Sequence, residues 1–143
     1  MKDNNNKLDF NQWSCSEYNN NLNGFYVTGA NLYQITNQYS TIGENSLKLI
    51  NNTNSMMGYR TTPIVVQQDK TYKLTANIYA PISTVNMVLQ QEGGSYEYVS
   101  VNPSNKLQTV SVTINSDNYS NLIVRFNIYT GYIYIDCLNV SLI

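Results

Sequence analysis

The side chains that could catalyse a reaction are few in this chain. Its 143 residues include nine carboxylates, eight basic side chains and two cysteines, but no histidine. An imidazole base and a histidine-ligated metal are therefore excluded. Glu92 and Glu97 flank the Gly93-Gly94 turn and are the nearest candidates for a pair. Glycoside hydrolysis needs two carboxyl groups about 5–10 Å apart across a cleft, whereas solvated hairpin ends commonly carry charges. We expect no catalytic residue and no enzyme.

A second set of side chains has the chemistry of ligand binding rather than catalysis. Aromatic rings, amides and a guanidinium alternate with apolar residues in several segments, so that they share the polar faces of predicted strands. The members are Asn77, Tyr79, Asn86, Gln90, Arg125, Asn127 and Tyr129. Such groups suit a ligand that presents both C–H surfaces and hydroxyl groups. They lie on one face if their strands belong to one sheet. The alternative is an ordinary solvated sheet face.

The elements that must position these residues are β-strands. From Thr71 to Ala80 and from Leu122 to Tyr129, apolar and polar residues alternate with a period of two. Further strands are expected at Phe25–Ile35, Ser46–Ile50, Ile64–Gln67, Val85–Gln91, Tyr96–Val101, Thr109–Ile114 and Tyr132–Val140. Eight or nine short strands at this spacing predict an all-β fold, a β-sandwich jelly roll of two antiparallel sheets formed by residues 1–143.

Composition argues against two classes of partner. Only 12% of the residues are charged and the net charge is −1, so the clustered basic surface that binds nucleic acid is not expected. No apolar run approaches the roughly 20 residues that cross a bilayer, and the start of the chain lacks the apolar stretch of a secretory signal. We expect no nucleic-acid binding and no membrane insertion. Either the protein is not exported through a secretory signal or the chain is a domain of a longer parent, and the Asn-rich residues 1–6 are expected to be a linker or a disordered start.

Four short motifs follow one another along the chain. They are Leu8-Asp9-Phe10-Asn11-Gln12-Trp13, Gly43-Glu44-Asn45-Ser46-Leu47-Lys48-Leu49, Asp69-Lys70-Thr71-Tyr72-Lys73-Leu74-Thr75-Ala76 and Tyr134-Ile135-Asp136-Cys137-Leu138-Asn139-Val140. In this order and spacing they resemble the carbohydrate-binding modules of families 4, 9 and 22, which have a galactose-binding-domain-like jelly roll. The match is to the opening motif, the Gly-x-x-Ser-Leu-Lys-Val strand entry, the Gly-Lys-Thr-Tyr element and the closing Tyr-Val-Asp motif of that group.

The resemblance implies that a concave sheet face binds a polysaccharide or glycan, and the set described above is placed there. Tyr59, on a segment expected to be a loop, would lie at the rim of this face. Arg125 could bind sugar hydroxyls or an acidic sugar, or it could pair with Glu97 or Glu92. Trp13 could stack on a sugar or pack in the core.

The resemblance also implies a structural calcium near the chain ends. Asp136 matches the closing aspartate that is a ligand in relatives. The opening carboxylate of those relatives is replaced here by Asn11. Calcium prefers several oxygen ligands that include carboxylates, and Glu44 or Asp9 could supply the missing charge. Without calcium, Asp136 would cap a strand end or pair with a lysine.

The two cysteines follow the opening and closing motifs. If the first and last strands are neighbours, as in the family, Cys15 and Cys137 could come within disulfide distance. The alternative is two separate buried thiols.

These expectations combine into one functional hypothesis. The chain is expected to be a non-catalytic glycan-binding module that acts beside neighbouring domains of a larger secreted or cell-surface protein. The alternative is a structural or adhesive module of a surface adhesin, or of a phage tail or baseplate protein, in which case it would belong to the virion.

Overall fold

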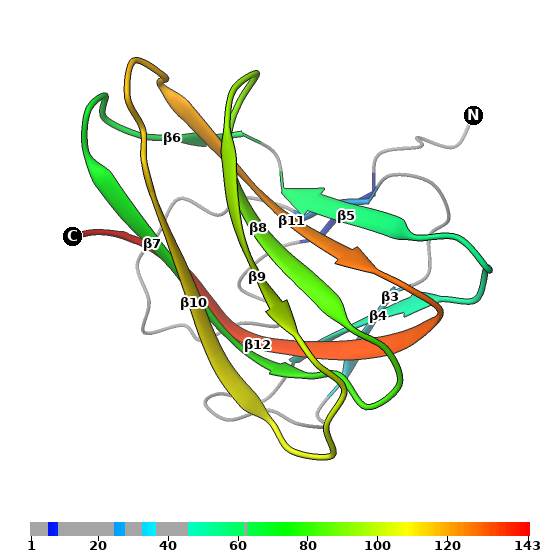
Figure 1. Cartoon of the computed structure of the whole chain (residues 1–143). Helices are drawn as coiled ribbons and strands as arrows, with labels where there is room; N and C mark the ends of the chain where they lie inside the picture. Colours follow the sequence, from blue (N-terminus) through cyan, green and yellow to red (C-terminus); the bar gives the residue numbers. More distant parts are fainter. Residues whose placement is uncertain (1–5, 9–24, 28–32, 37–45, 62) are drawn as a thin grey trace, which may run out of the picture.

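The computed structural model describes residues 6–8, 25–27, 33–36, 46–61 and 63–143. Within these ranges, twelve β-strands form two antiparallel sheets that pack face to face (Figure 1). The predicted all-β sandwich is therefore confirmed. In the described part of the chain, no helix is long and apolar enough to span a membrane.

The larger sheet contains seven strands. Six of them follow the order β1-β2-β5-β11-β8-β9, and β6 also pairs with β11. Their bounds are β1 (Asn6–Leu8), β2 (Phe25–Val27), β5 (Met57–Thr61), β6 (Ile64–Val65), β8 (Val85–Gln91), β9 (Tyr96–Val101) and β11 (Asn121–Ile128). The turn between β8 and β9 contains Gly93 with a φ of 83°, a conformation that glycine adopts without steric cost.

The smaller sheet contains five strands in the order β10-β7-β12-β4-β3. Their bounds are β3 (Tyr33–Thr36), β4 (Ser46–Asn51), β7 (Thr71–Tyr79), β10 (Gln108–Asn115) and β12 (Gly131–Leu142). The register between β12 and β7 shifts between Asp136 and Asn139, where Cys137 has a φ of 53°. Such a β-bulge bends a strand locally. Figure 1 shows β9 and β10 side by side along one edge, although they belong to different sheets.

The strand predictions are accurate where alternation is strong. Val85–Gln91 and Tyr96–Val101 are confirmed residue for residue. Phe25–Ile35 is wrong as a single strand, because β2 and β3 lie in different sheets. A loop is expected around Tyr59, but Met57–Thr61 forms β5, which pairs with both β2 and β11. The interior Gly58 conceals this strand, since glycine is depleted from strands. The first residue of β1, Asn6, is the last residue of the predicted linker.

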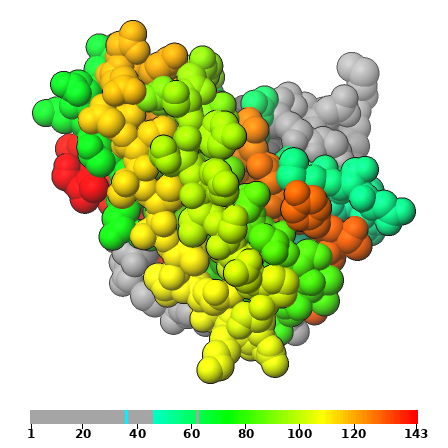
Figure 2. Space-filling view, viewed as in Figure 1, coloured from blue at the N-terminus to red at the C-terminus, as the bar shows by residue number. Residues whose placement is uncertain are grey.

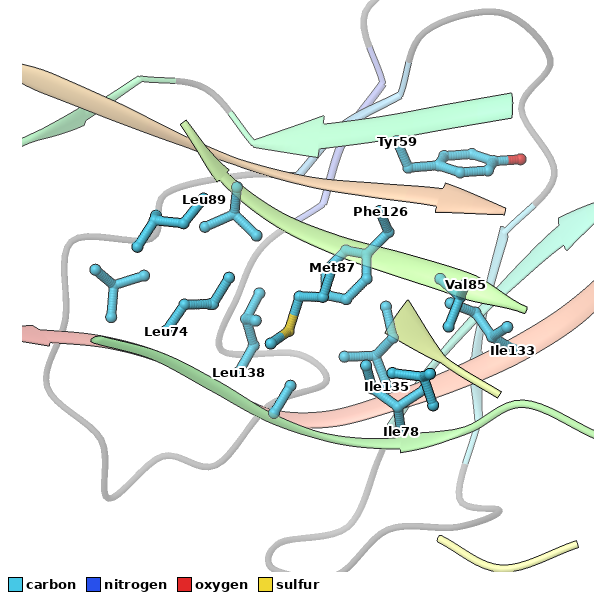
Figure 3. Close-up of a cluster of buried hydrophobic side chains, with 14 of the residues drawn as sticks. Tyr59, Leu74, Ile78, Val85, Met87, Leu89, Phe126, Ile133, Ile135 and Leu138 are labelled. Carbon is cyan, nitrogen blue, oxygen red and sulfur yellow. The ribbon is translucent and has the colours of Figure 1, made fainter. Parts of the chain in front are cut away.

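The hydrophobic core fills the space between the sheets. Leu74, Ile78 and Leu138 of the smaller sheet face Met87 and Phe126 of the larger one, and all five are fully buried (Figure 3). Burial of each such side chain contributes roughly 1.5–3 kcal/mol relative to exposure. Because side chains alternate along a strand, the inward residues of β8 and β11 leave the intervening ones on the outer face of the larger sheet. That outer face carries the candidate site.

Candidate ligand-binding site

A row of side chains crosses the outer face of the larger sheet at Arg125. On β11, Arg125 pairs with Arg60 of β5 on one side and with Val88 of β8 on the other. Val88 in turn pairs with Tyr98 of β9. Residues directly opposite in antiparallel strands point to the same side of the sheet. The four side chains therefore form one row across four strands.

Two further rows flank this one. Their members are Gly58, Asn127, Asn86 and Ser100 on one side, and Ile123, Gln90 and Tyr96 on the other. Ser100 Oγ donates a hydrogen bond of 2.7 Å to Asn86 Oδ1. This bond orients the Asn86 amide and occupies its carbonyl oxygen, so that its NH₂ group can donate to a ligand.

A pocket of about 370 Å³ lies on these rows and is lined by Met56, Asn86, Val88, Gln90, Tyr96, Tyr98, Arg125 and Asn127. Val88 is 5% exposed and forms an apolar floor. Tyr96 and Tyr98, with exposures of 57% and 55%, rise from the edge strand β9. Their ring centroids are 6.2 Å apart and the rings are tilted by 40°. Figure 2 shows the side chains of β8 and β9, green to yellow, at the surface near the orange β11.

The loop between β4 and β5 supplies the rim of the pocket at Met56. Buried Asn51 anchors this loop, because its Nδ2 donates to Ser55 O at 2.7 Å and to Ile128 O at 3.0 Å. Its Oδ1 accepts a hydrogen bond of 2.9 Å from Thr53 N. One amide thus fixes the loop against the end of β11 and determines where Met56 stands.

The pocket combines two kinds of recognition. Exposed tyrosine rings and the apolar floor can pack against the C–H faces of a ligand. The amides of Asn86, Gln90 and Asn127 and the guanidinium of Arg125 can bond to its hydroxyl groups. The arrangement therefore suits a polyhydroxylated ligand that has apolar faces.

Four of the predicted binding residues meet in this pocket: Asn86, Gln90, Arg125 and Asn127. Their part in binding stays a prediction. Tyr129 follows β11 at the turn into β12 and is 49% exposed. It lies outside the set of residues that line the pocket.

The prediction that Asn77 and Tyr79 share a face with Arg125 is wrong. Both lie on β7, in the smaller sheet, whereas Arg125 lies on β11 in the larger one. Asn77 Oδ1 accepts a hydrogen bond of 2.7 Å from Thr109 Oγ1, and the Tyr79 ring lies 6.0 Å from that of Tyr134. Alternation identifies the outward residues of a strand but does not say which sheet the strand joins.

The prediction that Tyr59 lies at the rim of the binding face is also wrong. It is fully buried, and its hydroxyl donates a hydrogen bond of 2.7 Å to Ile50 O. Because Met57–Thr61 is a strand, Tyr59 points into the core and Arg60 points outward. Burial raises the pKa of Tyr59 to about 12, since the phenolate is poorly solvated there.

This raised pKa predicts an alkaline loss of stability that depends on Tyr59. The folded-state pKa exceeds the ordinary value of 10, so the stabilisation is complete below pH 10 and is lost as the pH rises toward 12. At pH 7, Tyr59→Phe is expected to cost about 1 kcal/mol, because the Ile50 carbonyl loses its donor. Urea denaturation measures the free energy of unfolding of the wild type and of Tyr59→Phe. The difference between these two free energies should narrow as the pH rises above 10. Parallel stability curves over that range would contradict the assignment.

The chain-end predictions fall largely outside the described residues. Asn11 and Glu44 lie there, as do Asp9, Trp13 and Cys15. Asp136 is fully buried on β12, opposite Asn77. Among the described residues, no group of three carboxylate or cysteine side chains that could bind a metal is found. The calcium site stays a prediction.

Cys137 is disulfide-bonded. Cys15 is the only other cysteine in the sequence. Cys137 is therefore not a free buried thiol, and the alternative of two separate thiols is wrong.

Sequence reasoning missed Tyr96, Tyr98, Val88 and Met56 as pocket residues. A signal for the tyrosines was present. Tyr96 and Tyr98 have the same parity on a predicted strand that follows the Gly93-Gly94 turn. A hairpin about that turn places Tyr96 opposite Gln90. Met56 had no such signal, because its position depends on the loop held by Asn51.

Solved structures with the same fold include several carbohydrate-binding modules. TmCBM61 in complex with β-1,4-galactotriose has a TM-score of 0.63 at 13% identity, covering 96% of this chain and 99% of that one. The CBM22-1 xylan-binding domain from Paenibacillus barcinonensis Xyn10C has a TM-score of 0.65 at 10% identity, covering 96% and 92%. At such identities the likeness establishes the fold.

A third similar structure is the enzymatically active domain of tailspike protein 4 from bacteriophage CBA120. The TM-score is 0.65 at 14% identity, and the match covers 96% of this chain. The chain spans only 21% of that tailspike domain.

The search of curated proteins finds no match. A family model does match, over residues 6–131, and its description is "Carbohydrate binding domain". This range covers most of the sequence and includes every strand that lines the pocket. The chain therefore belongs to this family of carbohydrate-binding domains.

Proposed function

We propose that this domain binds a polysaccharide in the pocket on the outer face of the larger sheet. The observation that carries the proposal is the exposed pair Tyr96 and Tyr98 beside the polar side chains of Asn86, Gln90 and Asn127. Aromatic rings next to hydrogen-bonding groups match the alternating C–H and hydroxyl surfaces of a sugar chain. Membership of the carbohydrate-binding family supports the same ligand class.

Binding without catalysis is part of this proposal. Hydrolysis of a glycosidic bond needs a pair of carboxyl groups at the bound sugar. Glu97 pairs with Leu89 across β8 and β9 and so points to the opposite side of the sheet from Tyr96 and Tyr98. Glu92 lies in the turn that joins these strands. The proposed role is therefore adhesion, which brings neighbouring domains of a secreted or cell-surface parent protein to a glycan.

A second candidate function is supported by the similarity to the phage tailspike domain. In that case the sandwich would contribute to assembly or host attachment in a virion. Binding to isolated polysaccharides separates the two candidates, because an assembly module would not need a ligand in the pocket.

Calcium is proposed as a structural ion, with Asp136, Asn11 and Glu44 among its ligands. The support is Asp136, which is fully buried on β12 and matches the closing aspartate of the resemblance. Carboxylate oxygens are among the ligands that calcium prefers. Asp136, the described residue among these ligands, belongs to the smaller sheet, so the proposed role of the ion is to stabilise the fold.

The proposed function is tested by filling the pocket. Val88→Phe places a phenyl ring on the pocket floor and is expected to abolish retardation by soluble polysaccharides in affinity gel electrophoresis. Val65→Phe is the matched control, because Val65 is 70% exposed on β6 and lies outside the pocket. This control should bind like the wild type. The screen is run with millimolar calcium and again after EDTA. The thermal midpoint of unfolding is measured under both conditions, and a bound structural calcium predicts a lower midpoint after EDTA.

Failure of the wild-type domain to bind any polysaccharide, while remaining folded, would favour the assembly function. Equal binding by Val88→Phe and the wild type would show that the site lies elsewhere on the molecule.

A further inference from the structure

The two arginines of this chain face each other on the pocket side of the larger sheet. Arg60 and Arg125 are the only two arginines in the sequence. They are direct partners in the pairing of β5 with β11. Both are half-buried. Like charges directly opposite in a sheet repel each other. Two cationic side chains on neighbouring strands also make the local potential positive, which favours a negatively charged ligand on this face.

Among the described lysines, Lys7 shares the larger sheet with the arginines, since it lies on β1 opposite Tyr26, which pairs in turn with Arg60. The other four described lysines lie elsewhere. Lys48 is on β4 and Lys73 is on β7, both in the smaller sheet, while Lys70 and Lys106 are in exposed loops. Lys48 Nζ lies 4.7 Å from the centre of the Tyr132 ring. The positive charge in the pocket therefore belongs to Arg125. Its planar guanidinium is the group that binds carboxylates with two parallel hydrogen bonds.

Among the described residues, no carboxylate lines the pocket beside this charge. The described lining residues are Arg125, which carries a charge, together with amides, tyrosines and apolar side chains. Of the described acids, Asp136 is on the smaller sheet, and Glu97 and Asp117 line a separate pocket of about 440 Å³. Asp117 Oδ2 accepts a hydrogen bond of 2.8 Å from Gln91 Nε2 there. Glu92 and Asp69 are in exposed turns.

Space for the arginine is made by Gly58. A Cβ atom at this position would lie 3.0 Å from Asn127 Oδ1 and 3.8 Å from Arg125 Cδ. The side chains of Arg125 and Asn127 therefore rest against the bare backbone of β5. The position of the guanidinium follows from packing on both sides, by β5 and by the Val88 floor.

We propose that the pocket selects an acidic polysaccharide and that Arg125 binds the carboxylate of a uronate residue. This inference rests on the proposed function and names its ligand class. Tyr96 and Tyr98 pack on the sugar faces, and the three amides bind hydroxyl groups. Partial burial strengthens the charge pairing, because screening by water is reduced.

The test compares uronate polymers with their own carboxyl-reduced forms, which keep the chain but replace each carboxylate with a neutral alcohol. Polygalacturonate, alginate and glucuronoxylan are the probes, and affinity is measured by isothermal titration calorimetry. The acidic form of at least one polymer is expected to bind about tenfold to a hundredfold more tightly than its reduced form. That preference should fall as the salt concentration rises.

Variants assign the preference to one residue. Arg125→Gln should remove the preference for the acidic form while leaving residual binding of the reduced form. Arg125→Lys should retain part of it, because the charge remains and the planar fork is lost. Lys106→Gln is the matched control for net charge, since Lys106 is exposed in the loop between β9 and β10. It should bind like the wild type.

The outcomes separate this inference from the proposed function. Equal, salt-insensitive binding of acidic and reduced polymers overturns the inference and keeps the polysaccharide site. Tighter binding of a sulfated polymer than of any uronate polymer overturns the assignment of a carboxylate. An unchanged preference in Arg125→Gln overturns the role of Arg125. Binding of neither acidic nor reduced polymers overturns both proposals.

Discussion

Replacing Tyr96 and Tyr98 together with alanine is expected to reduce polysaccharide affinity by about a hundredfold to a thousandfold. Tyrosine is among the residues that contribute most to binding, at about 2 kcal/mol for each critical side chain, and each 1.4 kcal/mol is a factor of ten. Both rings are more than half exposed on the edge strand β9 and contribute little to the core. The loss should therefore appear in binding and leave folding unchanged.

Calorimetric titration of the wild type and the double variant measures this effect. Tyr129→Ala is the matched control, because Tyr129 is 49% exposed and lies outside the pocket. It should lose less than a factor of about three. The conservative variant Tyr96→Phe with Tyr98→Phe should retain most of the affinity if the rings act by stacking. A double alanine variant with unchanged affinity would show that β9 is not part of the site.

The location of the site illustrates what alternation can and cannot predict. On β11 the pattern places Arg125 and Asn127 outward and Phe126 inward, and the structure confirms this placement. A period of two follows from strand geometry alone, so it is visible in the sequence. The burial of Phe126 therefore determines the orientation of both polar neighbours.

Membership of a sheet is a different kind of information. Asn77 alternates as regularly as Asn127, yet β7 pairs with β10 and β12 while β11 pairs with β5 and β8. The two strands lie on opposite sides of the core. Only long-range pairing distinguishes them, and the local pattern is the same in both cases. For this reason the predicted set divided into pocket residues and residues of the other sheet.

Tyr59 shows a third limit of predicting the site from the local sequence. The segment Met57-Gly58-Tyr59-Arg60 has weak strand propensity because of its glycine. Neighbouring strands β2 and β11 supply the hydrogen-bonding partners that make it a strand. Once it is a strand, the outward residue is Arg60 and the inward residue is Tyr59. Tertiary pairing thus buries Tyr59 and leaves Arg60 on the outer face.

The shape of the pocket depends on both kinds of element. The strands β8, β9 and β11 fix the floor and one wall, and hairpin register about Gly93 aligns Tyr96 with Gln90. The rim at Met56 depends on the hydrogen bonds of Asn51 to a loop and to the end of β11. The hairpin contribution could be derived from the sequence. The rim could not, because it results from contacts between residues 77 positions apart.

Breaking the disulfide bond of Cys137 is expected to lower the free energy of unfolding by about 4–5 kcal/mol. A bridge to the only other cysteine, Cys15, closes a loop of about 120 residues, and such a loop restricts the unfolded chain by that amount in the chain-entropy model. Urea denaturation with and without reductant measures the change. The double variant Cys15→Ala with Cys137→Ala is the control, because reductant should not alter its midpoint.

Reduction should change stability far more than binding. Cys137 is on β12 in the smaller sheet, whereas the pocket lies on the outer face of the larger one, beyond the core. The reduced domain should therefore bind polysaccharide with its normal affinity at temperatures where it remains folded. If reduction removed binding while the core stayed intact, the disulfide would be coupled to the pocket across the sandwich. Equal urea midpoints for the oxidised and reduced protein would instead show that the unfolded chain is not restricted by the bridge.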